Sequence, residues 1–497
     1  MRLKLSELLE EAGIATGKPA GDPIVTAVTD DSRRVEPGTV FVATCGSRVD
    51  SHLFLSDAVD SGAAALIVQR DVPAYNGVAI IVVPDSRDAM GKMAHAMAGN
   101  PTHDLTVIGV TGTNGKTTSA YLVEAILKAA GKNPGVIGTI EYRYGNVSQP
   151  SENTTPSSRR LAQMFADMKS QGVDSVAMEV SSHAADQRRI AGIQFDACIL
   201  TNITQDHLDY HGTMQAYAEA KYSIFGRYLA DAKTHGKDPV AIFNIDDSYG
   251  RQFAETYPGR KLTFSIEGDA DYRATDIHYG SHQTTFNLHW NGNSEQIVTQ
   301  LVGPYNVSNT LGAIAATMGV GIDVQHVKSG LAGLDNVPGR LEPVRSGQSF
   351  LVLVDYAHTP DALERVLLNA RHMTANRLIV VFGCGGDRDA GKRPKMAAIA
   401  ARLADIVIVT NDNPRTEDPR LIADQVMAGI DPDVAASKQI HRILDRRQAI
   451  GKSIELAEKG DVVIIAGKGH EDYQILGQEK VYFDDREVAR EFLKAKP

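Results

Sequence analysis

The sequence has few of the residues that mark disulfide-rich, zinc-binding or nucleic-acid-binding proteins. Its 497 residues include three cysteines, Cys45, Cys198 and Cys384, and no pair of them has C-x-x-C spacing. Neither a disulfide framework nor a zinc site is therefore expected. The chain has one tryptophan, Trp290, and a net charge of −10. Binding to nucleic acid needs a basic stripe, so this charge argues against a nucleic-acid partner.

Long apolar runs are also missing. No run approaches the roughly 20 residues that a membrane-spanning helix needs, and Met1–Glu11 begins a charged amphipathic helix without a signal-peptide core. We therefore expect a soluble cytoplasmic protein, a monomer that acts on small molecules and has no membrane span. Hydrophobic residues make up 43% and charged residues 23% of the chain, which is ordinary for globular domains. The length favours about three domains.

The most informative stretch is residues 105–118. The apolar run Leu105–Val110 predicts a strand, and Gly112-Thr-Asn-Gly-Lys-Thr-Thr118 follows it as a glycine-rich loop. Apolar residues then recur at helical spacing until Gly131, at Leu122, Ala125, Ile126 and Ala129. A strand, a glycine loop and a helix in this order are typical of a nucleotide-phosphate site, although Val110 replaces the first glycine of the strict pattern. Backbone N–H groups would face the phosphates, with Lys116 on the β/γ-phosphates and Thr117 on Mg²⁺.

Three α/β domains are predicted around this loop. Residues 1–100 alternate short apolar runs with helical stretches and form a small α/β domain, which we expect to bind a uridine-nucleotide substrate on the resemblance described below. Residues 101–337 form the central ATP-binding domain, a P-loop domain with a doubly wound, mostly parallel sheet. Within this domain, residues 262–302 are expected to form antiparallel strands, as an appended set of hairpins. Residues 338–497 form a C-terminal Rossmann-like α/β domain that binds an amino acid.

Several polar groups of the central domain lie where a ligand is expected. Glu179 ends a predicted strand, which suits a Mg²⁺ ligand, although a solvent-facing glutamate is the alternative. Residues 206–211 are rich in potential ligands, and the pattern does not select one of them. Lys221 lies on a predicted helix and would by composition be an ordinary solvated charge. Asn306 precedes an alanine-rich helix that it could cap.

Four polar loops follow the strands of the third domain and share the carboxyl edge of its sheet, where open α/β sheets bind ligands. They are residues 355–360, 383–388, 411–415 and 467–471. Two arginines and one glutamate at this edge would suit a zwitterion, with arginine for its carboxylate and glutamate for its ammonium. Unrelated surface ion pairs are the alternative.

Taken together, these motifs resemble those of the Mur ligases of peptidoglycan synthesis. The resemblance extends from about residue 24 to 487 and rests on the following stretches: Gly112–Thr118, Glu179–His183, Asn202–His211, Ala220-Lys221, Tyr305–Asn309, Gly339-Arg340 and Asp355–Asp361. It implies an ATP-dependent, ADP-forming amide ligase that works through an acyl phosphate. Asp412-Asn-Pro-Arg415 matches the signature of members that add diaminopimelate to a UDP-N-acetylmuramoyl-dipeptide.

The resemblance also implies roles for individual residues. Lys116, Glu179, His207 and Lys221 would be catalytic, with Thr117 and Glu179 on one Mg²⁺, His207 on a second, and Lys221 carbamylated and facing the metal. The ATP contacts would be Gly112, Thr113, Asn114, Gly115, Lys116, Thr117, Thr118, Asn306, Arg340, Asp355 and His358. The uridine-linked substrate would contact Asp30, Ser32, Ser47, Arg48, Val49, Asn153, Thr154, Thr155, Ser181, Gln187 and Arg189. The diaminopimelate contacts would be Arg388, Asp412, Asn413, Pro414, Arg415, Gly467 and Glu471.

Two other functions share part of this pattern. A folylpolyglutamate synthetase would have the phosphate loop and the lysine, but neither the uridine-binding domain nor Asp412–Arg415. A P-loop switch ATPase would hydrolyse ATP to drive a partner and would need no small-molecule site in the third domain. Phosphate release that depends on an amine distinguishes a ligase from a switch.

Overall fold

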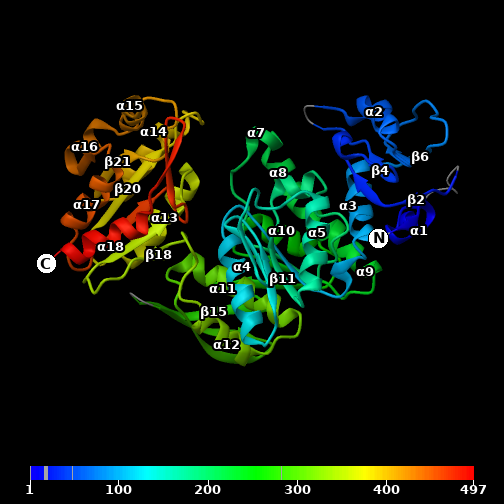
Figure 1. The fold of residues 1–497 in the computed structure, drawn as a ribbon. Coiled ribbons are helices and arrows are strands. Elements are labelled where there is room, and N and C mark those ends of the chain that lie inside the picture. Colours follow the sequence, from blue (N-terminus) through cyan, green and yellow to red (C-terminus); the bar gives the residue numbers. More distant parts are fainter. Residues whose placement is uncertain (1, 16–20, 47–48, 281–282, 497) are drawn as a thin grey trace. The chain divides into compact units, whose positions relative to one another are not determined.

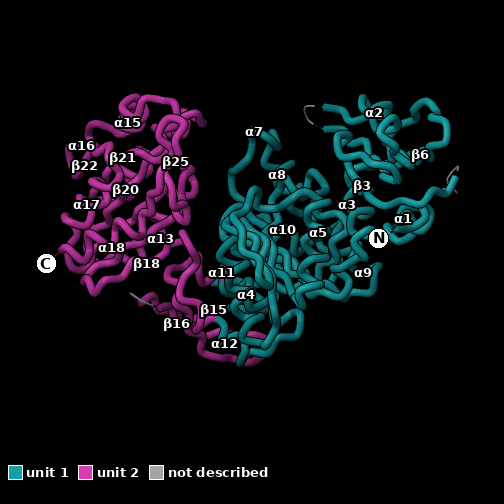
Figure 2. The backbone as a smooth tube through the Cα atoms, viewed as in Figure 1, with its two compact units in different colours: residues 1–273, 310–330 teal, residues 274–309, 331–497 magenta. Residues whose placement is uncertain are grey.

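Among the described residues, three β-sheets of four or more strands, with helices packed on them, organise the chain (Figure 1). The structure is a computed structural model and describes residues 2–15, 21–46, 49–280 and 283–496. The chain divides into two compact units, residues 1–273 with 310–330 and residues 274–309 with 331–497 (Figure 2). Each unit is described by itself.

The first sheet of unit 1 is small and wholly parallel, in the order β3-β4-β5-β6. Alternate residues of β4 enter different cores, Val40 and Val42 on one face and Phe41 on the other, so both faces are covered. The apolar run that begins at Ile24 is divided, because β2 pairs antiparallel with β1. The strands are β1 Leu3–Lys4, β2 Ile24–Val25, β3 Ala27–Thr29, β4 Thr39–Val42, β5 Ala65–Val68 and β6 Ala79–Val82, and the α-helices are α1 Leu5–Glu11, α2 Leu55–Asp60 and α3 Ser86–Met97.

The second sheet places the phosphate loop at its centre. Its order in unit 1 is β10-β9-β8-β11-β7-β12-β13-β14, and β7, which leads into the loop, lies between β11 and β12. These inner strands are parallel, and only β9 and β10 at one edge are antiparallel. The strands are β7 Thr106–Thr111, β8 Pro134–Ile137, β9 Glu141–Tyr144, β10 Val147–Pro150, β11 Ser175–Glu179, β12 Ala197–Leu200, β13 Val240–Asn244 and β14 Lys261–Ser265. The α-helices are α4 Lys116–Ala129, α5 Ser158–Ser170, α6 Ser182–Asp186, α7 Leu208–His211, α8 Met214–Ser223, α9 Ala230–Thr234 and α10 Ser248–Thr256.

The prediction of antiparallel strands across residues 262–302 is wrong for its first part. β14 pairs parallel with β13, and the first residues of β15, Tyr272–Tyr279, pair parallel with β14. β16, Thr284–Trp290, and β17, Asn293–Thr299, form an antiparallel hairpin, as predicted. The alternation of apolar and polar residues predicts a strand but carries no information about its direction.

The third sheet belongs to unit 2 and has the order β18-β19-β23-β20-β21-β22, parallel except for β18. Alternate residues of β23 enter two different cores, Ile464 on one face and Ile465 on the other. Such two-sided burial explains the near-continuous apolar strands of this region. The strands are β18 Glu342–Pro343, β19 Leu351–Asp355, β20 Leu378–Cys384, β21 Ile406–Asn411, β22 Gln439–Arg442, β23 Val462–Ala466, β24 Tyr473–Leu476 and β25 Glu479–Tyr482. The helices are α11 Pro304–Gly319 and α12 Val324–Ala332, each shared between the units, then α13 Pro360–Met373, α14 Lys392–Leu403, α15 Pro419–Met427, α16 Pro432–Ser437, α17 Arg446–Leu456 and α18 Asp485–Ala495.

The predicted fold class is confirmed: an α/β chain of three domains with a mostly parallel central P-loop sheet. The exact domain limits at residues 100 and 337 stay a prediction. In the part of the chain that the structure describes, no helix is both long enough and apolar enough to cross a membrane.

Within unit 1, helix α3 of the first sheet packs closely against the segment that follows α6. A Cβ on Gly91 would lie 2.6 Å from the carbonyl oxygen of Ala191, and one on Gly192 would lie 3.0 Å from the carbonyl oxygen of Gly91. The ion pair between Arg188 and Asp85, at 3.1 Å, borders this contact. Small residues and an ion pair thus hold the first sheet against the central one.

Helix α3 also carries a fully buried histidine, His95. Both ring nitrogens lack a hydrogen-bond partner in the described residues, and burial lowers the pKa of His95 to about 3. The folded protein therefore holds this ring neutral, whereas the unfolded chain protonates it near its ordinary pKa of about 6.5. A group with a depressed pKa in the folded state stabilises the fold above the unfolded-state pKa and loses that contribution as the pH falls.

We predict that His95 lowers the stability of the protein in acid. Between about pH 6.5 and 4.5, the free energy of unfolding of the wild type should fall more than that of His95→Leu, by roughly 1.4 kcal/mol per pH unit. Urea unfolding of both full-length proteins, followed by circular dichroism across this pH range, measures the difference. Identical pH dependence in the two proteins would contradict the prediction.

Candidate active site

The loop between β7 and α4 has the shape of a phosphate cradle. Gly112 and Gly115 have φ angles of 148° and 87°, and a Cβ on Gly112 would overlap the hydroxyl of Thr201. The loop is braced by β12 and the segment after it, because Thr113 N donates to Asn202 O at 2.8 Å. Glycine is therefore required where the loop turns, and the N-terminus of α4 opens onto it.

Lys116 folds back over this loop. Its Nζ donates to the carbonyl oxygens of Gly112 and Thr113, each at 2.9 Å. Thr117 and Thr118 follow in the buried first turn of α4. The sequence prediction that these residues surround one cradle, together with Asn114, agrees with this geometry, while their contacts with ATP stay a prediction.

Lys221 lies beside the same cradle and is buried. From helix α8 its Nζ donates to Gly112 O at 2.8 Å and lies 4.7 Å from the centre of the Tyr217 ring. Burial lowers the pKa of Lys221 well below its ordinary value; the neighbouring Lys116 lowers it further, and Asp206 opposes the shift. A neutral amine is the form that reacts as a nucleophile. Composition alone predicted a solvated lysine here, and the tertiary structure overturns that prediction.

Glu179 ends β11 next to the cradle strand. Its carboxylate accepts hydrogen bonds from Thr139, from N at 2.8 Å and from Oγ1 at 3.0 Å, and its side chain is almost fully buried. Carboxylate and hydroxyl oxygens are the ligands that Mg²⁺ prefers. Glu179 and the buried Thr117 therefore have the ligand types that a magnesium site needs. The two hydrogen bonds from Thr139 fix the orientation of the Glu179 carboxylate.

His207 has a left-handed backbone, with φ of 52°, and belongs to an aromatic group at the edge of the cradle. Its ring centre lies 4.7 Å from that of His183 and 6.3 Å from that of Tyr217. The neighbouring His211 is held by a contact of 3.0 Å between its Nε2 and Ser182 Oγ. His207 is exposed and His211 is half-buried, so His207 is the more accessible of the two. Its role as a metal ligand stays a prediction.

The residues expected to contact the muramoyl-dipeptide are brought together beside Glu179. Thr155 Oγ1 donates to Glu179 O at 2.9 Å and accepts from Ser181 N at 3.1 Å. Arg189 donates to Gln187 Oε1 and to Thr155 O. Thr154 contacts Thr139 through the two hydroxyls at 3.0 Å, and Asn153 N donates to Tyr142 OH at 3.1 Å.

The expected uridine contacts lie at the carboxyl edge of the first sheet. Asp30 and Ser32 follow β3, and Val49 O accepts from Gly46 N at 2.9 Å. Ser47 and Arg48 lie outside the described residues. Asp30 and Ser32 are accessible, as a binding role requires.

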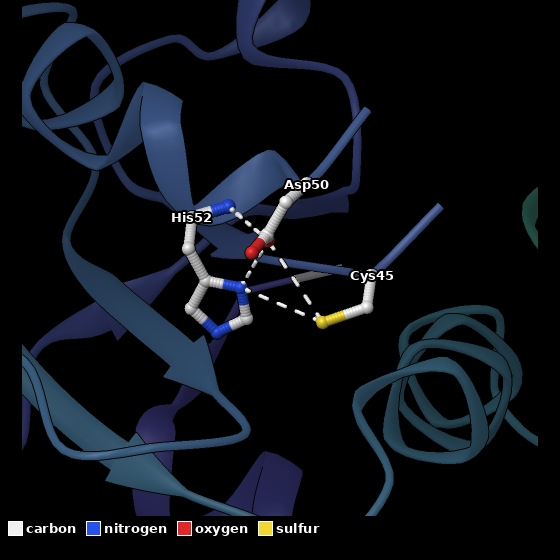
Figure 3. Close-up of side chains that lie close together, drawn as sticks. All are labelled: Cys45, Asp50 and His52. Atoms are coloured by element: carbon white, nitrogen blue, oxygen red, sulfur yellow. Dashed lines mark hydrogen bonds and ion pairs between the residues drawn. The ribbon is translucent and has the colours of Figure 1, made fainter. Parts of the chain in front are cut away.

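Next to this edge, Cys45, Asp50 and His52 form a cluster with metal-binding atoms within 4.8 Å of one another (Figure 3). His52 Nδ1 lies 2.7 Å from Asp50 Oδ1, while its Nε2 accepts a hydrogen bond from Gln69 N at 3.2 Å. Since the N–H of Gln69 occupies the lone pair of Nε2, the ring proton lies on Nδ1 and points to Asp50. A metal on Nδ1 would move the ring proton to Nε2, where it would face the N–H of Gln69, so this geometry favours a hydrogen-bond network over a metal site.

In unit 2, a first group of predicted residues surrounds the end of β19. Asp355 is buried and accepts from Leu341 N and Ala357 N, each at 2.8 Å. Burial raises the pKa of Asp355, and the positive charge of Arg340 opposes the shift. The guanidinium of Arg340 lies over the ring of Tyr356, 5.2 Å from its centre. His358 belongs to the same loop, with Nδ1 2.8 Å from Tyr356 O.

Asn306, also in unit 2, lies in the first turn of α11. The prediction that it precedes the helix is wrong, since the helix begins at Pro304. Its Nδ2 donates to Val302 O at 2.9 Å, so the side chain holds the chain entering the helix.

A second group in unit 2 gathers the loops after β20 and β21. Arg415 has a φ of 52°, and its Nη1 donates to Gly386 O at 2.8 Å. A Cβ on Gly385 would lie 2.9 Å from Arg415 Nη1 and 3.8 Å from Arg388 Cγ. The two arginines predicted to bind one carboxylate therefore flank the same glycine, beside Pro414.

The loop after β23 completes this group through a residue that the sequence predictions missed. Lys468 is fully buried; its Nζ donates to Asn413 Oδ1 at 2.9 Å and lies 3.4 Å from Asp412 and 3.8 Å from Glu471. Burial raises the pKa of Glu471, while the charge of Lys468 opposes the shift. Gly467 lies against Asp412, because a Cβ on Gly467 would be 3.0 Å from Asp412 Oδ2. Lys468 lies in one of the predicted polar loops, but the sequence does not reveal that it is buried. Only its burial and its contacts show that it holds Asn413, Asp412 and Glu471 together.

Comparisons with known proteins agree with both units. Three family descriptions match the chain: "Mur ligase family, catalytic domain" at residues 24–97, "Mur ligase middle domain" at 110–317, and "Mur ligase, glutamate ligase domain" at 339–469. The UDP-N-acetylmuramoyl-L-alanyl-D-glutamate–2,6-diaminopimelate ligase of Geobacillus kaustophilus is 44% identical over 95% of this chain and 96% of its own. The enzyme of the same name from Thermosynechococcus vestitus is 44% identical over 99% and 98%.

A solved structure of a UDP-N-acetylmuramoyl-L-alanyl-D-glutamate–2,6-diaminopimelate ligase is also similar. It is 34% identical, with a TM-score of 0.75, over 100% of this chain and 99% of that one.

The strained glycine of the cradle provides a test of the phosphate site. Gly112→Ala should move the loop and weaken nucleotide binding by about tenfold or more, since a strained backbone costs about 1–3 kcal/mol. Gly131→Ala is the matched control, because Gly131 also has a positive φ, of 74°, but nothing within 4 Å of a Cβ. Titration with ATP measures both affinities. Equal affinity of the two variants would contradict the assigned cradle.

Proposed function

The chain belongs to the Mur ligase family, and from that premise we propose that it joins meso-diaminopimelate to UDP-N-acetylmuramoyl-L-alanyl-D-glutamate at the expense of ATP in peptidoglycan synthesis. The observation that carries an ATP-driven ligation is the pairing of Lys116 and Lys221 on the carbonyl of Gly112, at the phosphate cradle. The loops that hold Arg388, Arg415 and Glu471 support diaminopimelate as the amine.

The proposed reaction has two steps. An oxygen of the D-glutamate γ-carboxylate attacks the γ-phosphorus of ATP; the bond to the β,γ-bridging oxygen breaks, and ADP leaves. The neutral amine of diaminopimelate then attacks the acyl carbon, phosphate leaves with the bonding electrons, and the nitrogen loses a proton. Phosphorylation is needed because a free carboxylate is a poor electrophile.

Both reactants of the first step are anions, so positive charge at the cradle is required. Lys116 supplies one cation, and the N–H groups at the start of α4 supply the positive end of a helix dipole. Thr117 and Glu179 would hold Mg²⁺, which neutralises phosphate charge when bound, and His207 would hold a second ion. Thr155, which donates to the last carbonyl of β11, and Ser181, whose N donates to Thr155 Oγ1, would position the D-glutamate side of the substrate.

The distal end of diaminopimelate carries a carboxylate that lysine lacks. We propose that Arg388 and Arg415 bind this carboxylate, and that Asp412 and Glu471 bind the distal ammonium. Lys468 would act as a positioning residue, because it holds Asn413 and screens the two acids from each other. Since Arg415 donates to carbonyl oxygens, its positive charge remains available to the ligand.

The proposed function predicts that phosphate release depends on both cosubstrates. With ATP and the uridine-linked dipeptide, phosphate should appear when meso-diaminopimelate is added and only weakly when lysine is added. A coupled phosphate assay with each amine measures this. A switch ATPase would release phosphate without the amine, and a folylpolyglutamate synthetase would not use the uridine-linked dipeptide, so either result would overturn the proposal.

The variant Arg415→Ala tests which residue binds the distal carboxylate of the amine substrate. It should raise the KM for meso-diaminopimelate about ten- to hundredfold, as expected for the loss of a charge-assisted contact, and leave the KM for ATP unchanged. An unchanged KM for diaminopimelate would remove Arg415 from the amine site.

We further propose that Lys221 reacts with CO₂, so that its neutral amine becomes a carbamate and releases one proton. The carbamate would replace an uncharged amine with an anion that faces the metal. Removal of dissolved CO₂ should lower turnover, and bicarbonate should restore it in the wild type but not in Lys221→Ala. Phosphate release under CO₂-free buffer, with ¹³C-bicarbonate NMR of the carbamate carbon, tests this. Turnover that is insensitive to CO₂, with no carbamate signal, would refute it.

A further inference from the structure

A cavity of about 500 Å³ in unit 1 is lined by four arginines that come from three separate segments. Arg34 belongs to the loop after β3, Arg159 and Arg160 to the first turn of α5, and Arg189 to the segment after α6. Glu152 is the one carboxylate among the lining residues. The cavity is therefore strongly positive in a protein whose net charge is −10.

The start of α5 adds to this positive character. Cations normally favour the C-terminal end of a helix, yet Arg159 and Arg160 are the second and third residues of α5, and its first turn has no acidic residue. The N-cap, Ser157, also lines the cavity and makes no side-chain capping hydrogen bond. Two guanidinium groups and the N–H groups of the helix start would all be stabilised by one anion.

The carboxylates of the protein do not balance these arginines. Arg34 contacts Asp31 at 3.5 Å, but Asp31 is bound more closely by Arg33, at 2.8 Å. Among the described residues, no ion pair is found for Arg159, Arg160 or Arg189. Arg189, which is half-buried, donates to Gln187 and to Thr155 O, both neutral, and burial lowers its pKa. Several cations that line one cavity without counter-ions repel one another, and a bound anion would remove that repulsion.

The position of the cavity indicates which anion it holds. Arg34 lies two residues after Ser32, which is expected to contact uridine, while Asn153 and Arg189 are expected to contact the muramoyl-dipeptide. The cavity joins these two sets of residues. In the uridine-linked substrate, the group between uridine and the muramoyl sugar is the diphosphate.

We propose that Arg34, Arg159 and Arg160 bind the diphosphate of the uridine-linked substrate in this cavity. The inference rests on the proposed function and assigns residues that its motifs do not contain. Each guanidinium can donate two parallel N–H bonds to non-bridging phosphate oxygens. These arginines bind substrate far from the reacting carboxylate along its chain, so they set its affinity and take no part in bond making.

The double variant Arg159→Ser/Arg160→Ser tests the proposal. It should raise the KM for the uridine-linked dipeptide about tenfold or more, while kcat and the KM for ATP stay within about twofold. Arg420→Ser/Arg490→Ser is the matched control, since it removes the same charge from exposed helical positions of unit 2. An unchanged KM for the dipeptide substrate in the first variant would overturn the proposal.

Ligand fragments separate the diphosphate from other anionic groups. Calorimetric titration of the wild type should show UDP binding more tightly than uridine, and Arg159→Ser/Arg160→Ser should lose most of that difference. If the arginines bind a carboxylate of the dipeptide, UDP affinity will be unchanged and the proposal is wrong. If wild-type protein shows no amine-dependent phosphate release although UDP binding depends on these arginines, the proposed function fails and the diphosphate site stands.

Discussion

The structure of the phosphate cradle depends on one carbonyl oxygen that two lysines share. Lys116 and Lys221 both donate to Gly112 O, at 2.9 and 2.8 Å. Two full positive charges at one buried oxygen repel each other strongly, and burial penalises the more enclosed lysine. Lys221 is therefore driven toward its neutral amine, while Lys116 is less deeply buried than Lys221. The same geometry explains the glycine at position 112, since a Cβ there would overlap Thr201 and displace the carbonyl.

Sequence patterns predicted the parts of this site that are local. The strand, loop and helix around Lys116 follow from apolar spacing and glycines, and the polar loops after parallel strands had to share one sheet edge because parallel strands end together. The importance of Lys221 came only from the family resemblance, because the burial that changes its pKa depends on the Gly112 and Tyr217 contacts. Lys468 was missed for the same reason, and the parallel direction of β14 was missed because alternation does not encode it.

The third sheet shows how far the amino-acid site depends on distant residues. Arg446 and Asp485 form a fully buried ion pair at 2.6 Å, and Arg446 also donates to Ala466 O and Asn411 O. Those two carbonyls end β23 and β21, the strands that lead into the loops of Lys468 and Asp412. One ion pair from α17 and α18 thus fixes the ends of both strands. Such a pair adds little net stability after desolvation, so its contribution here is to geometry.

The partners of the arginines separate those that hold the fold from those that we propose to bind ligands. Arg446, Arg377 and Arg393 are bound by the carboxylates of Asp485, Asp461 and Glu417, which neutralise their charge inside the protein. Arg189 and Arg415 instead donate to carbonyl oxygens. A carbonyl satisfies the N–H groups and fixes their direction, but it carries only a partial charge and leaves most of the cation uncompensated. An acidic protein that acts on anionic substrates can therefore keep its net negative charge and still present positive sites. An arginine oriented by neutral oxygens keeps a charge that an anionic substrate can neutralise.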